Sequence, residues 1–148
     1  MQSDQICVLF RHPSRKVRRG PLREFLVDLA GRAASGRPVT CLITTDRELR
    51  ALNRKFRKKD YATDVLSFPG ELPDGALGEI AVSLDRAAAQ AAEHGHSLEE
   101  EIRILILHGL LHLMGMDHES DSGEMARAET RWRRRLGLPP ALVERAAP

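Results

Sequence analysis

The stretch SLEEEIRILILHGLLHLMGMDH (residues 97–118) constrains the fold most, because a helix start signal precedes a long apolar run. Ser97 followed by Glu100 predicts a capping box, in which each side chain binds the backbone N–H of the other residue. From residue 102 to residue 114 almost every side chain is apolar, a pattern typical of a helix buried nearly all round. We therefore expect this helix to lie at the centre of the core.

The rest of the chain alternates between apolar, β-branched runs and segments with apolar residues at helical spacing. Strands are predicted at 5–10, 39–44, 63–68 and 77–82, and helices at 21–34, 45–57, 83–95 and 123–136. The order βαβαββααα predicts an α+β fold, in which a small mixed sheet of about four strands packs with about five helices. With 148 residues, the chain is expected to form a single domain, residues 1–148.

Composition and charge favour a globular protein with a polyanionic partner. Hydrophobic residues make up 42% and charged residues 30%. No apolar run is long enough to span a bilayer, and no signal peptide opens the chain, so a cytoplasmic location without membrane association is expected. The net charge is only +2, but seven Lys or Arg residues and one acid fall within 47–59. Further basic runs at 11–19 and 131–135 point to nucleic acid or another polyanion.

Three histidines fall within eleven residues of the central stretch. His108 and His112 are four positions apart, which places both rings on one helical face. A continuous helix would carry His118 about 15 Å beyond His108, so the helix must end between them. Gly115 suits that break, because glycine readily adopts the left-handed conformation. The spacing therefore predicts one zinc ion per chain, held by three histidines with water in the fourth position, as in catalytic zinc sites.

The H-x3-H-x5-H spacing matches the metzincin protease signature, with one departure. Gly109 stands where those proteases place the glutamate that acts as general base. Asp117 and Glu79 could in principle supply a carboxylate, but neither has the required spacing. We therefore expect a zincin-like metal-binding helix that serves other hydrolytic chemistry. A metallopeptidase or another metal-dependent hydrolase remains the alternative.

The motif HGLLHLMGMDH resembles H-G-x-L-H-L-x-G-y-D-H of the bacterial YbeY family. LNRKFR (52–57), TDVLSFP (63–69) and LGEI (77–80) are similar to further motifs of that family, although aspartate is more usual at the position of Glu79. The resemblance implies a zinc-dependent, single-strand-specific endoribonuclease that hydrolyses RNA phosphodiester bonds. It also implies a role in ribosomal RNA processing, namely 3′-end maturation of the small-subunit RNA, and in ribosome quality control.

The same resemblance implies that His108, His112 and His118 bind zinc and that Arg57 is functional. A guanidinium can stabilise the charge that develops on phosphoryl oxygens during cleavage. Zinc is expected to lower the pKa of its bound water toward about 7, and the hydroxide then attacks phosphorus or deprotonates the ribose 2′-OH. Further expected roles are acceptance by Asp117 of a hydrogen bond from a ligand histidine, substrate-backbone binding by Ser67, and RNA-backbone binding by Arg54, Lys55, Lys58 and Lys59.

The expected partners are single-stranded RNA and the ribosome, with ribosomal proteins or GTPases as further candidates, and the chain is expected to be a monomer. Aromatic residues make up only 4% of the chain, so base stacking is expected to play a minor part. A second alternative is a non-enzymatic ribosome-assembly factor whose zinc is structural. Four protein ligands around the metal would favour that alternative, and three ligands with water would oppose it.

Overall fold

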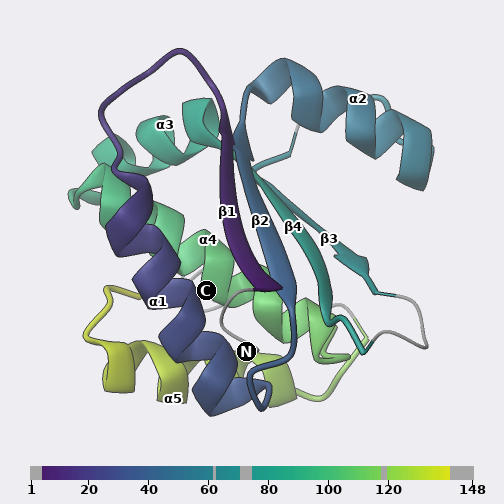
Figure 1. The fold of residues 1–148 in the computed structure, drawn as a ribbon, viewed down its shortest axis with the longest axis vertical. Helices are drawn as coiled ribbons and strands as arrows, with labels where there is room; N and C mark the ends of the chain where they lie inside the picture. The colour runs from purple at the N-terminus through teal and green to yellow at the C-terminus, as the bar shows by residue number, and fades with distance from the viewer. Residues whose placement is uncertain (1–4, 62, 71–74, 118–119, 141–148) are drawn as a thin grey trace.

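The computed structural model describes residues 5–61, 63–70, 75–117 and 120–140 (Figure 1). The predicted order of elements is confirmed, and their ends differ from the predicted ones by at most two residues. The four strands are β1 (Ile6–Arg11), β2 (Val39–Thr44), β3 (Val65–Pro69) and β4 (Gly78–Ser83). The five helices are α1 (Arg19–Ala33), α2 (Asp46–Arg57), α3 (Leu84–His94), α4 (Leu98–Leu113) and α5 (Glu124–Leu136).

The strands form one mixed sheet in the order β1-β2-β4-β3. β1, β2 and β4 run parallel, whereas β3 pairs antiparallel with β4. The α+β class and the four-stranded mixed sheet are thus as predicted. β1 and β3 are the edge strands. Among the described residues, the pairing of β3 with β4 is the only antiparallel one in the sheet.

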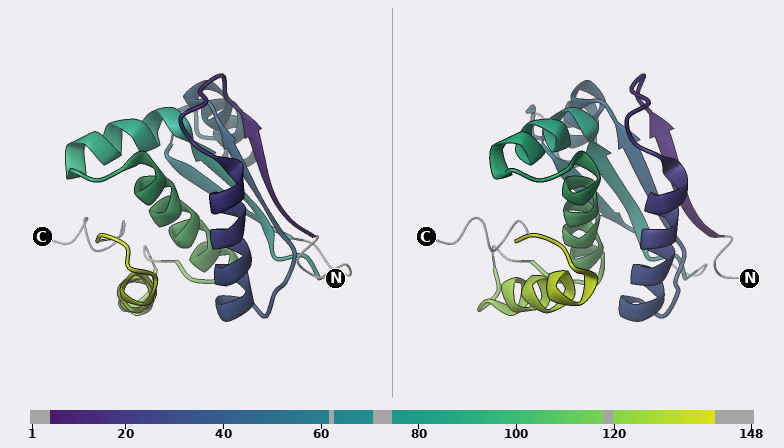
Figure 2. Two further views of the ribbon diagram at one scale, coloured as in Figure 1. Left: turned by 60° about the vertical axis from the view of Figure 1, so that its left-hand side comes forward. Right: turned by 90° about the vertical axis from the view of Figure 1, so that its left-hand side faces the viewer.

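Alternate residues of the sheet face two different helical layers. Ser67 of β3 lies opposite Ile80 of β4, and both side chains approach Gly109 of α4. Leu66 and Ala81, one residue along each strand, face the other way and form a smaller core with Leu49 of α2. Figures 1 and 2 show α1, α4 and α5 on one side of the sheet, with α2 at the end of the molecule far from α5.

Helix α4 is the centre of the main core, as its apolar run predicts. Eleven of its 16 residues are buried, and they contact β3, β4 and three other helices. The Ser97–Glu100 capping box is present in full. No helix in the described ranges is both long and apolar enough to cross a bilayer.

Helix α2 begins with a side-chain cap but not with a full capping box. The Thr45 hydroxyl accepts the Glu48 backbone N–H at 3.1 Å, as a helix cap should. The Glu48 carboxylate, however, accepts hydrogen bonds from the Thr44 hydroxyl (2.6 Å) and the Arg11 guanidinium (3.0 Å) rather than completing a capping box. Glu48 therefore ties α2 to the ends of β1 and β2, because two better donors lie within its reach.

Candidate metal centre

The carboxyl end of α4 turns back at Gly115, as predicted. Gly115 has φ of 93°, in the left-handed region where a side chain would be strained. Its N–H donates to the carbonyl of His112 (2.9 Å), and the N–H of Met116 donates to the carbonyl of Leu111 (3.1 Å). These two bonds form a Schellman motif, which satisfies carbonyls of the last helical turn while reversing the chain. The chain after Gly115 therefore leaves the helix axis within one turn of His112.

The rings of His108 and His112 meet on one face of α4. Their Nε2 atoms are 3.1 Å apart, and the ring planes are inclined at 74°. The His108 side chain is only 8% exposed, whereas His112 is half-buried. The pair thus lies between the core and solvent.

Glu129 of α5 holds the ring of His108 in place. Its Oε2 lies 2.5 Å from Nδ1 of His108, and the Glu129 side chain is completely buried. With a carboxylate at Nδ1, the proton of a neutral His108 ring sits on Nδ1, and the lone pair of Nε2 faces His112. Carboxylate–histidine pairs of this kind orient metal-ligating rings and raise their basicity.

The start of α5 positions Glu129. The Asp121 carboxylate accepts the backbone N–H groups of Gly123 (2.9 Å) and Met125 (2.8 Å), which fixes where the helix begins. Met125 and Ala128 then face the core, and Glu129 falls on the same buried face. Glu129 was not predicted from the sequence. An acid beside apolar residues at helical spacing was the available signal, because a buried carboxylate needs a partner.

The structure gives a physical reason for glycine at position 109. A Cβ atom there would lie 2.8 Å from Cγ2 of Ile80 and 3.1 Å from the hydroxyl oxygen of Ser67. Position 109 therefore faces the sheet at close range, and a glutamate there would have to displace the side chains of Ile80 and Ser67. The Ser67 hydroxyl donates to the Gly109 carbonyl at 2.9 Å, which joins the edge strand to α4 next to His108.

The described donors fit a shared metal ion. Two nitrogens on one zinc at tetrahedral angles lie about 3.3 Å apart, since each Zn–N bond is about 2.0–2.1 Å, and the observed separation is 3.1 Å. His118, the third predicted ligand, lies outside the described residues. Within those residues no group of three His, Cys, Asp or Glu side chains surrounds a common point.

Asp117 lies in the turn that follows α4, directly before the third predicted ligand. Its side chain accepts the Ser120 hydroxyl at 3.1 Å, and its carbonyl accepts the backbone N–H groups of Ser120 and Asp121. The residue is exposed. Asp117 therefore shapes the connection between the turn at Gly115 and the start of α5.

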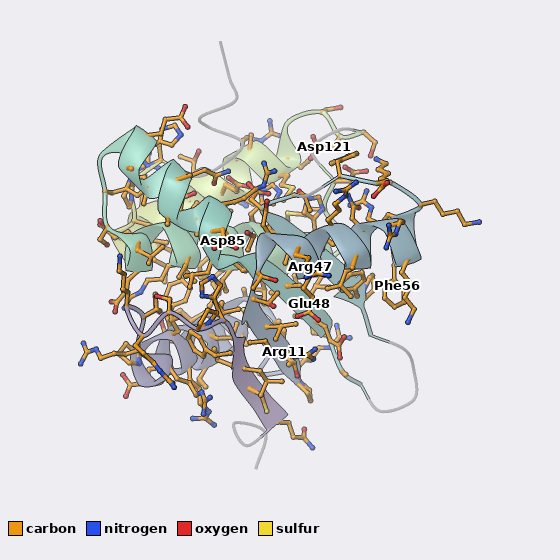
Figure 3. The ribbon with its side chains drawn as sticks, turned by 90° about the horizontal axis from the view of Figure 1, so that it is seen from above. Arg11, Arg47, Glu48, Phe56, Asp85 and Asp121 are labelled. Atoms are coloured by element: carbon orange, nitrogen blue, oxygen red, sulfur yellow. The ribbon has the colours of Figure 1, made fainter. Side chains whose placement is uncertain are left out.

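The predicted RNA-binding residues lie apart from the histidine pair. Arg57 is exposed at the carboxyl end of α2, together with the four cationic residues predicted to hold RNA, Arg54, Lys55, Lys58 and Lys59. Figure 3 shows Phe56, the neighbour of Arg57, at the opposite end of α2 from Arg47. Because α2 and α4 pack on opposite faces of the sheet, β3 separates these residues from His108 and His112.

The family model and the curated relatives that this chain matches share one description. The family model described as Endoribonuclease YbeY matches residues 22–137. Curated relatives carry the same description. One from Solibacter usitatus (strain Ellin6076) is 56% identical over 138 residues, which are 93% of this chain and 92% of that protein. One from Koribacter versatilis (strain Ellin345) is 59% identical over 107 residues, 72% of this chain and 70% of that protein.

A solved structure also has the same fold. The solution structure of TM1509 from Thermotoga maritima superimposes with a TM-score of 0.59 at 27% identity. The match covers 84% of this chain and 85% of that one.

Proposed function

This chain belongs to the YbeY endoribonuclease family, and we propose that it is a metal-dependent endoribonuclease that cleaves single-stranded RNA. The observation that carries the proposal is the histidine pair on α4, whose Nε2 atoms lie 3.1 Å apart beside the buried Glu129 carboxylate. Burying a carboxylate beside a pair of imidazoles costs free energy of folding, and such clusters are common at functional sites.

We propose zinc as the cofactor, held by His108, His112 and His118 with one position left to solvent. Zinc, when bound, is a Lewis acid that makes water more acidic and offsets charge on phosphoryl oxygen. Glu129 keeps the His108 ring oriented and its Nδ1 protonated, so that Nε2 stays available as a donor. Gly109 lets α4 approach β3 and β4, which sets the depth of the pair below the surface.

The cationic end of α2 is proposed to bind the substrate. Asp60 pairs with Arg50 at 2.9 Å and lies 3.8 Å from Arg54. Arg57 and the nearby lysines have no carboxylate within salt-bridge distance among the described residues. A phosphodiester backbone supplies the missing negative charge. Arg57 is proposed to stabilise charge on the reacting phosphate, and Lys55, Lys58 and Lys59 to bind neighbouring phosphates.

The substrate is proposed to be ribosomal RNA, with cleavage at the 3′ end of the small-subunit RNA in the cytoplasm and a further part in ribosome quality control. Ribosomal proteins or GTPases are proposed as partners of a monomeric enzyme. These assignments rest on family membership. The basic character of α2 and α5 is the structural support for a ribosomal partner, because ribosomal RNA presents a dense array of phosphates.

The test of this function is a direct comparison of substrates. The zinc-loaded protein is incubated with single-stranded RNA, with duplex RNA of the same sequence, and with casein. Cleavage of the single strand alone supports the proposal. Hydrolysis of casein without RNA cleavage would make the protein a metallopeptidase, and absence of both activities would favour a structural metal.

Replacing Glu129 with glutamine is expected to weaken zinc binding by roughly 10- to 100-fold. The amide keeps the shape of the side chain and can still accept from Nδ1 of His108, but it lacks the negative charge that makes the ring a better ligand. Zinc affinity is measured by competition with a chromophoric chelator. Glu93→Gln, an exposed acid on α3, is the matched control and should bind zinc like the unaltered protein. Equal affinity in the Glu129 variant would remove this carboxylate from the metal site.

A further inference from the structure

Two aromatic rings lie largely in solvent at the cationic end of α2. Phe56 is 57% exposed and Tyr61 is 54% exposed. The other described aromatic rings of Phe and Trp, namely Phe10, Phe25, Phe68 and Trp132, are partly buried against the two cores. A chain with few aromatic residues therefore presents two of them to solvent within six positions of each other, in its most strongly basic segment.

Hydrogen bonds of Asn53 hold the turn after α2, which carries Tyr61, against the helix that carries Phe56. Asn53 is buried, its side-chain amide donates to the Tyr61 carbonyl at 2.9 Å, and its own carbonyl accepts the Lys59 N–H at 3.3 Å. Lys58 ends the helix with φ of 57°, a left-handed conformation that costs free energy for any residue except glycine. The segment from Lys58 to Tyr61 is thus folded back against α2.

The ring of Phe56 has a fixed edge and an accessible face. It meets Phe68 of β3 edge-on, with 5.3 Å between the ring centroids and 62° between the planes. The ammonium of Lys55 lies 5.1 Å from the Phe56 centroid. That lysine is exposed and flexible, so it can leave the ring for a phosphate while a planar group takes its place.

Single-stranded nucleic acid presents phosphates together with the flat faces of unpaired bases. The hydrogen bond from Arg50 keeps the pKa of the Asp60 carboxyl below its usual value, so that Asp60 stays ionised and neutralises charge on Arg50 and Arg54. Arg57 and Lys59 remain beside the two rings to meet a polyanion. Positive charge interleaved with exposed aromatic rings is the arrangement by which proteins bind single strands.

We propose that Phe56, together with Tyr61, is a stacking site for an unpaired nucleobase of the RNA substrate. This inference rests on the proposed function and identifies the residues that make it selective for single strands. A base within a duplex is already stacked on both faces, so only an unpaired base can lie on Phe56.

The site is close enough to the histidine pair to serve the same RNA molecule. Phe68, which contacts Phe56, directly follows Ser67 in β3. The Ser67 side chain points to the other face of the strand, where its hydroxyl donates to the carbonyl of Gly109 next to His108. One edge strand therefore separates the stacking site from the proposed metal ligands. In this proposal, one RNA strand that crosses the edge strand β3 contacts both.

Replacing Phe56 with leucine tests the proposal, because leucine keeps an apolar contact with Phe68 and removes the aromatic face. We expect KM for single-stranded RNA to rise roughly 5- to 100-fold, the range found when one stacked base is lost, with kcat within about threefold. The dependence of KM on salt should not change, since no phosphate contact is removed. Phe56→Tyr keeps the ring and should behave like the unaltered protein, as should Leu9→Ala, an exposed apolar residue on β1.

A set of substrates that each lack one base gives a second readout, and its first part needs only the unaltered protein. For the unaltered protein, one position of the missing base should raise KM by the same factor as Phe56→Leu, and in that variant the penalty at this position should vanish. Unchanged KM in Phe56→Leu, or no sensitive position in the unaltered protein, would overturn the stacking site. If the unaltered protein cleaves no RNA, the proposed function fails and the stacking site fails with it. RNA cleavage that is indifferent to Phe56 removes only the stacking site.

Discussion

Replacing His112 with alanine is expected to lower the rate of RNA cleavage by about 10³-fold or more, while the fold is retained. A bound metal ion lowers the pKa of its water to about 7, so loss of the ion removes most of the hydroxide that can attack the phosphate. His112 is half-buried at the end of α4, and its ring packs against His108 rather than into the apolar core. The substitution therefore removes a proposed metal ligand without opening a large cavity in the core.

The experiment on His112 measures kcat/KM on single-stranded RNA and the zinc content per chain. His94→Ala is the matched control, because His94 is exposed on α3 and far in sequence from the pair. The control should keep both zinc and activity, and thermal unfolding should be similar in all three proteins. An alanine variant at His112, shown to be free of other nucleases, that cleaves RNA at the unaltered rate would contradict the proposed chemistry.

Arg57→Ala is expected to lower kcat by about 10²- to 10³-fold, the usual cost of losing one group that stabilises charge in the transition state. Arg57 is exposed at the end of α2 and has no acidic partner among the described side chains, so its guanidinium is available to a phosphate. Lysine at this position should restore only part of the rate, because an ammonium cannot make the paired hydrogen bonds of a guanidinium.

Arg54→Ala is the control for Arg57, since Arg54 lies one turn earlier on the same helix and is 3.8 Å from the carboxylate of Asp60. It should change kcat by no more than a few-fold. Separate measurement of kcat and KM distinguishes a role of Arg57 in the transition state from a role in binding the RNA backbone. A raised KM with unchanged kcat would mean that Arg57 only holds the RNA backbone, which would contradict a role in the transition state.

Features that depend on nearby residues were predicted from the sequence. The capping box at Ser97, the shared helical face of His108 and His112, and the turn at Gly115 each follow from spacings of three to seven residues. Element types and order were predicted for the same reason, because apolar periodicity is a local property of the chain.

Features that depend on distant residues were not predicted. Glu129 lies 21 positions after His108, and only the packing of α5 on α4 brings its carboxylate to the ring. The strand order β1-β2-β4-β3, which separates Arg57 from the histidines, is likewise set by pairing between segments remote in sequence.

The proposed function requires that the histidines at the end of α4 hold a metal ion on which RNA cleavage depends. Metal analysis of the purified protein, joined to an RNA cleavage assay before chelation, after chelation and after return of zinc, tests it most directly. We predict about one zinc ion per chain, loss of cleavage when the metal is removed, and recovery when zinc is returned. A folded protein, shown to be free of metal and of other nucleases, that cleaves single-stranded RNA at the same rate would contradict the claim.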